Sequence, residues 1–268
     1  MALYCLVSPG GSPGVTTTAL ALALSWPWEV LLAECDPAGR RVLPGFMADR
    51  LKAPAGPGLL GLAMAGGSDA QPGDATLDEF TIPIPGSGHA RLLHGIRDPR
   101  HAQQLVPLWP RLAKMFTSTG TDVIADLGRI GSPNTPVALL ARADLIVMVL
   151  RPSLAQVDAA QPRLDALLDM LASRVPVGLC LIDTGPYPAA EVSKALSGLS
   201  VLAELPDAPP DARVLSDGAA PRLTFRTSML MRAAGTLGQQ MRDAATRSAV
   251  HAAAQPEATG VSASGSGP

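Results

Sequence analysis

The part of this chain best suited to chemistry is a run of small and hydroxyl-bearing residues between two apolar segments. It reads Ser8-Pro9-Gly10-Gly11-Ser12-Pro13-Gly14-Val15-Thr16-Thr17-Thr18. In phosphate-binding loops, backbone N–H groups hold phosphate oxygens, a lysine contacts the terminal phosphate, and the next Ser or Thr hydroxyl binds Mg²⁺. The pattern G-x-x-x-x-G-K-S/T fails twice, because Pro9 stands at its first glycine and Val15 at its lysine. The turn therefore has the shape of a phosphate-binding loop without its charge.

Carboxylates stand at the ends of two other apolar runs. Asp36 follows the run 29–33, after Glu34, and Asp126 ends the run 122–126. Because ligands bind at the carboxyl ends of the strands in doubly wound sheets, we expect these groups to meet the glycine turn there. Thr16 and Asp126 would then hold Mg²⁺, the latter through water, and Asp36 would orient an attacking water. A simpler interpretation remains open for each, because such residues also cap helices and start turns.

The segments that must position these residues alternate between strand and helix patterns. Strands are expected at 3–7, 29–33, 80–84, 92–95, 122–126, 145–150, 177–182 and 201–205. Helices are expected at 16–25, 58–65, 100–116, 154–171 and 226–250. The alternation predicts an α/β fold with a doubly wound, mostly parallel sheet and helices on both faces. We expect one domain over residues 1–250 and a disordered Ala/Ser/Gly/Pro tail over 251–268.

Composition narrows the class of protein. Hydrophobic residues make up 47% and charged residues 16% of the 268 residues, which is typical of a globular chain with a large core. A formal net charge of −2 gives no electrostatic footprint for nucleic acid or anionic lipid, so no specific nucleic-acid partner is expected. Cys5, Cys35 and Cys180 lie in apolar runs, which indicates buried thiols rather than a disulfide or metal site. With neither a signal peptide nor a long apolar span, the protein is expected to be cytoplasmic.

Two stretches resemble the ParA/MinD (SIMIBI) group of deviant phosphate-loop ATPases, whose loop reads K-G-G-x-G-K-T-T-T and whose second strand ends D-x-D-P-Q-G. They are Gly10–Ala19 and Leu31-Leu32-Ala33-Glu34-Cys35-Asp36-Pro37-Ala38-Gly39. The resemblance implies a nucleotide-binding loop with a degenerate Walker A motif, formed by Gly10, Gly11, Ser12, Pro13, Gly14, Val15, Thr16 and Thr17. Gly10 takes the place of the family's signature lysine, which acts across a dimer, and Val15 that of its phosphate lysine.

The resemblance also implies roles for residues outside the loop. Asp36 matches the family's water-activating aspartate, and the run 122–126 looks like its metal-binding strand, with Asp126 toward the metal. Asp183 stands where the family often has an asparagine near the base. The middle of the chain is most similar to the CpaE/TadZ branch, which localises Tad-type pilus secretion machinery and frequently has eroded loops. The similar pieces are 92–99, 122–129 and 143–152.

Three functions remain open. The first is a localisation or assembly factor that binds ATP and Mg²⁺ weakly or not at all, hydrolyses ATP slowly or not at all, and works as a homodimer with protein partners. The second is an active Mg²⁺-dependent ATPase in which a partner residue or a nearby arginine replaces the lysine; the candidates are Arg40, Arg41, Arg97 and Arg129. The third, an enzyme on a dinucleotide-type fold, is disfavoured because 10–14 does not match G-x-G-x-x-G. The Ala-rich last helix is expected to pack on the sheet, so direct membrane insertion is not expected, and any recruitment to a membrane would occur through a partner.

Overall fold

The computed structural model describes residues 1–52, 55–65, 77–172 and 174–254. The expected tail at 251–268 lies mostly outside these residues. The last helix, α9 (Met229–Ala254), continues past residue 250, and residues 255–268 are not described. The extent of the tail therefore stays a prediction.

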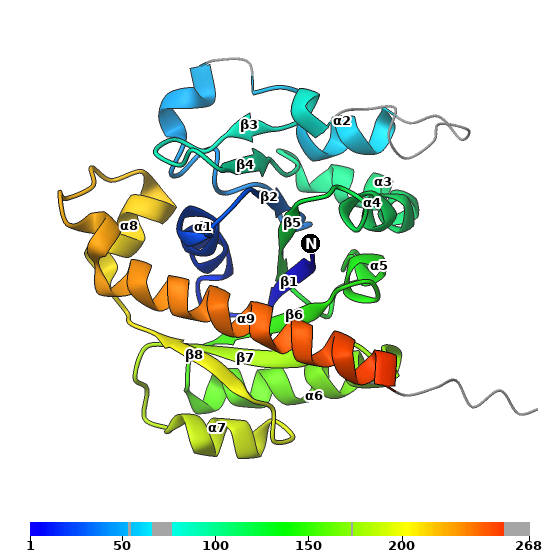
Figure 1. Cartoon of the computed structure of the whole chain (residues 1–268), viewed down its shortest axis with the longest axis vertical. Coiled ribbons are helices and arrows are strands. Elements are labelled where there is room, and N and C mark those ends of the chain that lie inside the picture. The colour runs from blue at the N-terminus through cyan, green and yellow to red at the C-terminus, as the bar shows by residue number, and fades with distance from the viewer. Residues whose placement is uncertain (53–54, 66–76, 173, 255–268) are drawn as a thin grey trace, which may run out of the picture.

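The centre of the molecule is an eight-stranded sheet (Figure 1). Its strands are β1 (Leu3–Ser8), β2 (Val30–Glu34), β3 (Ile82–Pro83), β4 (Ala90–Leu93), β5 (Asp122–Arg129), β6 (Leu145–Leu150), β7 (Val177–Ile182) and β8 (Val201–Leu205). Their order is β3-β4-β2-β5-β1-β6-β7-β8, and within the part of the chain that the structure describes β3 is antiparallel to β4 while the other neighbouring strands are parallel. The central strands β1 and β6 are continuous apolar runs with every residue buried, as expected for strands covered on both faces. The predicted doubly wound, mostly parallel sheet is confirmed.

Helices cover both faces of the sheet. One apolar cluster packs α1 (Val15–Ser25), α8 (Pro209–Asp217) and α9 against the sheet. The cluster on the other face includes α2 (Gly58–Met64), α3 (Ala102–Leu105), α4 (Trp109–Phe116), α5 (Val137–Leu140), α6 (Leu154–Met170) and α7 (Ala189–Ala195). Within the described residues, no helix combines the length and apolar composition needed to span a bilayer.

The main departure from the expected elements is the segment 100–116. In place of one helix, it forms α3, α4 and short 3₁₀ turns. The reason is Pro107 and Pro110, because proline lacks an amide hydrogen and clashes with the preceding helical turn. The same argument does not break α6, which runs through Pro162. All three cysteines are free and buried, as predicted.

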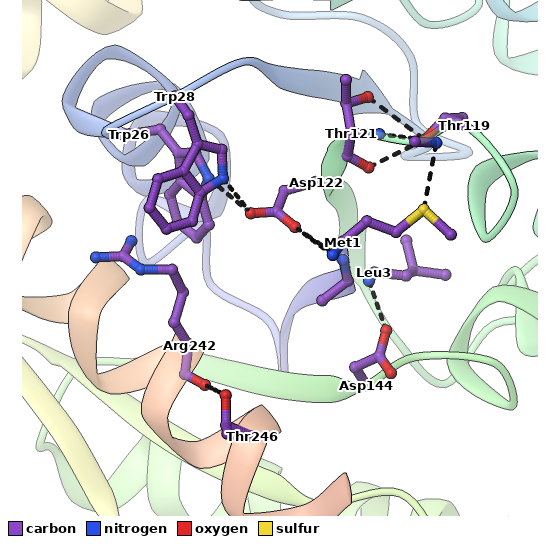
Figure 2. A network of polar contacts seen from close by, with 12 residues as sticks. Met1, Leu3, Trp26, Trp28, Thr119, Thr121, Asp122, Asp144, Arg242 and Thr246 are labelled. Atoms are coloured by element: carbon purple, nitrogen blue, oxygen red, sulfur yellow. Dashed lines mark hydrogen bonds and ion pairs between the residues drawn. The ribbon is translucent and has the colours of Figure 1, made fainter.

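At the amino end of β5, one carboxylate ties three parts of the chain together (Figure 2). Oδ2 of the buried Asp122 accepts hydrogen bonds from the indoles of Trp26 at 3.0 Å and Trp28 at 2.7 Å. The guanidinium of Arg242, on α9, lies 4.8 and 5.1 Å from the centres of these two indole rings, within cation–π range. We call these four residues the Asp122 cluster. It fixes α9 against the α1–β2 connection, at the end of the sheet opposite the glycine turn.

Candidate functional site

The glycine turn joins the carboxyl end of β1 to the amino end of α1. Its backbone is left-handed at Gly10, Gly11 and Gly14, with φ of 147°, 68° and 112°. Glycine adopts such angles freely, because it has no Cβ. Ser12 is also left-handed, with φ of 49°, although it carries a side chain. The turn therefore keeps its shape at Ser12 at a conformational cost of about 1–2 kcal/mol.

The amides of this turn are available to an anion. Within the described residues, the N–H groups of Gly10, Gly11, Ser12 and Gly14 donate no backbone hydrogen bond. The first three residues of α1 likewise have free amides, as every helix start does, and the first amide bonded back is that of Thr18, to the Gly14 carbonyl at 2.8 Å. A row of free N–H groups at a helix amino terminus is the usual arrangement for holding phosphate.

The turn opens onto a cavity of about 760 Å³. Its lining includes most of the predicted phosphate-site residues, namely Gly10, Gly11, Ser12, Gly14, Val15, Thr16, Thr17 and Asp36. Pro13 is buried and does not line it. Arg41, Arg129 and the end of α8 at Leu215, Ser216 and Asp217 also line it. The contribution of α8 was not predicted, because nothing in its sequence indicates proximity to the turn.

Asp126 lies behind Thr16 rather than in the cavity wall. The hydroxyl of Thr16 donates to Oδ2 of Asp126 at 2.5 Å, and the amide of Gly128 donates to Oδ1 at 3.0 Å. The pKa of Asp126 is raised to about 7, chiefly because burial removes the carboxylate from water. The hydrogen bond from Thr16 lowers this pKa, whereas the nearby carboxylates Asp36 and Glu34 raise it. Thr16 and Asp126 are thus brought together as predicted.

Asp36 lines the same cavity from the turn that follows β2. Its Oδ1 accepts the amide of Ala38 at 2.8 Å, and its carboxylate lies directly over Gly128, where a Cβ would come within 2.2 Å of Oδ2. Burial raises the pKa of Asp36, while the charges of Arg41 and Arg129 lower it. A glycine at 128 is therefore required for the Asp36 carboxylate to approach β5.

Val15 occupies the lysine position of the loop in an apolar environment. Its side chain is only 6% exposed and belongs to the apolar cluster under α1, α8 and α9. This position therefore carries no ammonium group, and Val15 contributes to the apolar core instead.

Glu34 has a structural role that the sequence did not reveal. Its buried carboxylate accepts the amides of Arg41 at 2.5 Å, Val42 at 2.8 Å and Gly95 at 3.2 Å. These bonds hold the loop after β2, which forms one wall of the cavity, onto the sheet. The pKa of Glu34 is raised, because burial outweighs these hydrogen bonds.

Asp183 lies apart from the cavity. It follows β7, has a left-handed φ of 75°, and its carboxylate is 3.8 Å from the guanidinium of Arg151. Arg151 also pairs with Asp207, after β8, at 3.3 Å. Asp183 is therefore in an ion-pair network at the ends of β6, β7 and β8, and its predicted contact with a base stays a prediction.

The donor set suits Mg²⁺ only together with phosphate. Within the described residues, no group of three or more His, Cys, Asp or Glu side chains could hold a metal ion by itself. The hydroxyl of Thr16 and the carboxylate of Asp126 are hard oxygen ligands, and Mg²⁺ is commonly bound by one carboxylate, water and substrate phosphates. The residues present therefore fit a Mg²⁺ ion that arrives with a polyphosphate.

Comparison with solved structures gives the fold. The chain is similar to MinD of Pyrococcus horikoshii complexed with Mg-ADP, with a TM-score of 0.69, 17% identity, and coverage of 92% of this chain and 98% of that one. It is also similar to a putative plasmid partition protein of Borrelia burgdorferi bound to AMPPNP, with a TM-score of 0.69, 11% identity, and coverage of 90% of this chain and 98% of that one. A chain of the MinC:MinD cell division complex of Aquifex aeolicus is similar with a TM-score of 0.68, 14% identity, and coverage of 91% of this chain and 96% of that one. The chain thus has the phosphate-loop fold of MinD and plasmid partition ATPases.

At the level of sequence, the comparisons give no family. No protein-family model matches the chain. No curated protein matches it significantly.

Proposed function

We propose that this chain is a ParA/MinD-type nucleotide-fold protein that acts as a localisation or assembly factor, with weak or no ATP hydrolysis. The observation that carries the proposal is the buried Val15 beside an intact Thr16–Asp126 pair. Phosphoryl transfer is catalysed mainly by positive charge placed on the developing anion. A loop that keeps the Thr16 hydroxyl and the Asp126 carboxylate but lacks this charge is better suited to supporting the fold and association with a second copy than to hydrolysing ATP.

The partners of such a protein would be a second copy of the chain and components of a larger assembly. The retained fold and cavity support this idea, because a phosphate loop that does not hydrolyse ATP can still organise a surface for association. The similarity to the CpaE/TadZ branch at 92–99, 122–129 and 143–152 favours a Tad-type pilus or secretion system as that assembly. Recruitment to the membrane would then occur through the partner.

Two measurements on the purified chain test this proposal. We expect an ATP affinity much weaker than micromolar and phosphate release near the background rate. Micromolar, Mg²⁺-dependent binding with steady phosphate release would contradict the proposal. In that case Thr16→Ala and Asp36→Ala should abolish the turnover, because Thr16 would bind the metal and Asp36 would orient the water.

The second candidate is an ATPase in which an arginine supplies the charge. A specific observation favours it, since both Arg41 and Arg129 line the cavity. Arg40 and Arg97, the other two arginines suggested by the sequence, do not line it. The measurement that separates the two candidates is turnover rather than binding, because a rebuilt phosphate site can hold nucleotide without hydrolysing it.

A further inference from the structure

We infer that Arg129 and Arg41 bind the phosphates of a nucleoside triphosphate in this cavity, in place of the two lysines that related loops carry. This inference rests on the proposed function in one respect only, namely that the cavity is a nucleotide phosphate site. It adds the source of the positive charge, which the glycine turn itself lacks.

Arg129 reaches the turn because β5 contains a bulge. Leu6 of β1 pairs with Asp126, whereas Ser8 pairs with Arg129, so two steps along β1 correspond to three along β5. The extra residue is accommodated at Gly128, where φ is 61°. Bulges beside active sites commonly redirect a side chain, and this one moves Arg129 next to the glycine turn.

The stem of Arg129 lies against Gly10. A Cβ placed on Gly10 would be 3.6 Å from Cδ of Arg129, which is ordinary van der Waals contact. Gly10 is the position of the signature lysine in the family that the loop resembles. Cδ of Arg129 therefore lies in contact distance of the point where the lysine side chain would begin, although the arginine comes from a different strand.

The backbone of Arg41, which also lines the cavity, is held by Glu34. The Glu34 carboxylate accepts the Arg41 amide at 2.5 Å, and the amide of Arg40 bonds the Ile96 carbonyl at 2.8 Å. These contacts fix the backbone of the loop while the side chain of Arg41 remains exposed.

Both guanidinium groups are uncommitted. Within the described residues, neither Arg41 nor Arg129 forms an ion pair or a side-chain hydrogen bond, although both lie close enough to Asp36 to act on its charge. Two free guanidinium groups, a row of free amides and the Thr16 hydroxyl therefore face one cavity. Guanidinium binds phosphate through two parallel N–H donors, so this set is suited to a polyphosphate.

The test is a titration of a fluorescent ATP analogue with Mg²⁺ against the full chain, carried to millimolar concentration, with displacement by unlabelled ATP. Wild type is compared with Arg129→Ala, Arg129→Gln and Arg41→Ala. Arg97→Ala is the matched control, since it removes an exposed arginine from outside the cavity lining. We expect each cavity variant to bind roughly tenfold to a hundredfold more weakly, and the control to stay within about twofold. Arg129→Gln preserves the side-chain stem and separates loss of charge from loss of packing.

Equal affinity in all variants, or no displaceable binding by wild type, would overturn the inference and leave the proposed function intact. Phosphate release is measured in the same samples. Rapid release by wild type that falls with Arg129→Ala would overturn the proposed lack of turnover and support the inference. Binding that depends on Arg129 without phosphate release would support both.

Discussion

The hydroxyl of Thr16 and the carboxylate of Asp126 lie 2.5 Å apart, at the amino end of α1 and near the carboxyl end of β5. A carboxylate buried beside two others would ordinarily stay protonated at neutral pH. The bonds from Thr16 and Gly128 favour its ionised form, and the pKa of about 7 is the balance of these effects. Asp126 is therefore expected to gain or lose its proton near neutral pH.

The first prediction concerns stability and pH. Because the folded-state pKa of Asp126 is raised from about 3.8 to about 7, its contribution to stability is full below about pH 4 and is lost as the pH rises through 7. The free energy of unfolding of wild type should fall relative to Asp126→Asn between pH 5 and 7.5, with a slope of up to about 1.4 kcal/mol per pH unit. Urea unfolding at several pH values measures this difference. A constant difference would contradict the shifted pKa.

The second prediction concerns the missing lysine. Val15→Lys should strengthen binding of the Mg²⁺–ATP analogue roughly tenfold or more, because it restores a charge-assisted contact of about 1.5–3 kcal/mol. The control is Val15→Met, which lengthens the side chain in the same apolar surroundings without adding charge. If neither variant changes the affinity while both remain folded by circular dichroism, the turn itself has lost the geometry of a phosphate cradle.

The third prediction concerns strain in the turn. Ser12→Gly should raise the free energy of unfolding by about 0.5–1 kcal/mol, because glycine adopts the left-handed φ of residue 12 without a steric penalty. Gly14→Ala should lower it by about 1 kcal/mol or more, although a Cβ at residue 14 meets no atom within 4 Å, because φ there is 112°. Chemical denaturation checks both. Destabilisation by Ser12→Gly would show that the serine side chain supports the turn.

The fourth prediction concerns the Asp122 cluster. Asp122→Ala should destabilise the fold by about 2–4 kcal/mol, because two indole N–H groups lose a charged acceptor. Trp28→Phe should cost about 1 kcal/mol, since the Trp28 side chain is half exposed and loses one bond. Asp158→Ala, which removes an exposed carboxylate from α6, should stay within about 0.5 kcal/mol in the same denaturation assay. Equal effects of Asp122→Ala and Asp158→Ala would contradict a structural role for the cluster.

Much of the fold follows from local pattern. The runs 145–150 and 177–182 were predicted as buried strands and form β6 and β7 with those bounds, because an apolar run between turns has few other stable states. The single helix expected at 100–116 was wrong, because Pro107 and Pro110 divide this segment into α3, a 3₁₀ turn and α4. The strand order depends on long-range pairing, which the sequence does not encode locally.

In the candidate site, too, some relationships follow from local sequence and others depend on long-range pairing. Thr16 and Asp126 were predictable as neighbours, because both follow from their positions at strand and helix ends. Arg129 was one of four candidate arginines, and the sequence could not select it. Its position depends on the pairing of β5 with β1 and on one extra residue at Gly128, a relationship between segments far apart in the chain.

The bulge in β5 also bears on how such proteins are recognised. A pattern that requires lysine before the loop threonine does not match this chain, because Val15 stands there. The arginine that we infer to replace the lysine follows Asp126, in the run Asp126-Leu127-Gly128-Arg129. The position of the arginine in this run depends on the glycine, since the glycine permits the bulge that redirects the arginine. A paired pattern, D-x-G-R together with a lysine-free glycine turn, would therefore select further chains in which the proposed replacement of the loop lysine by a strand arginine can be tested.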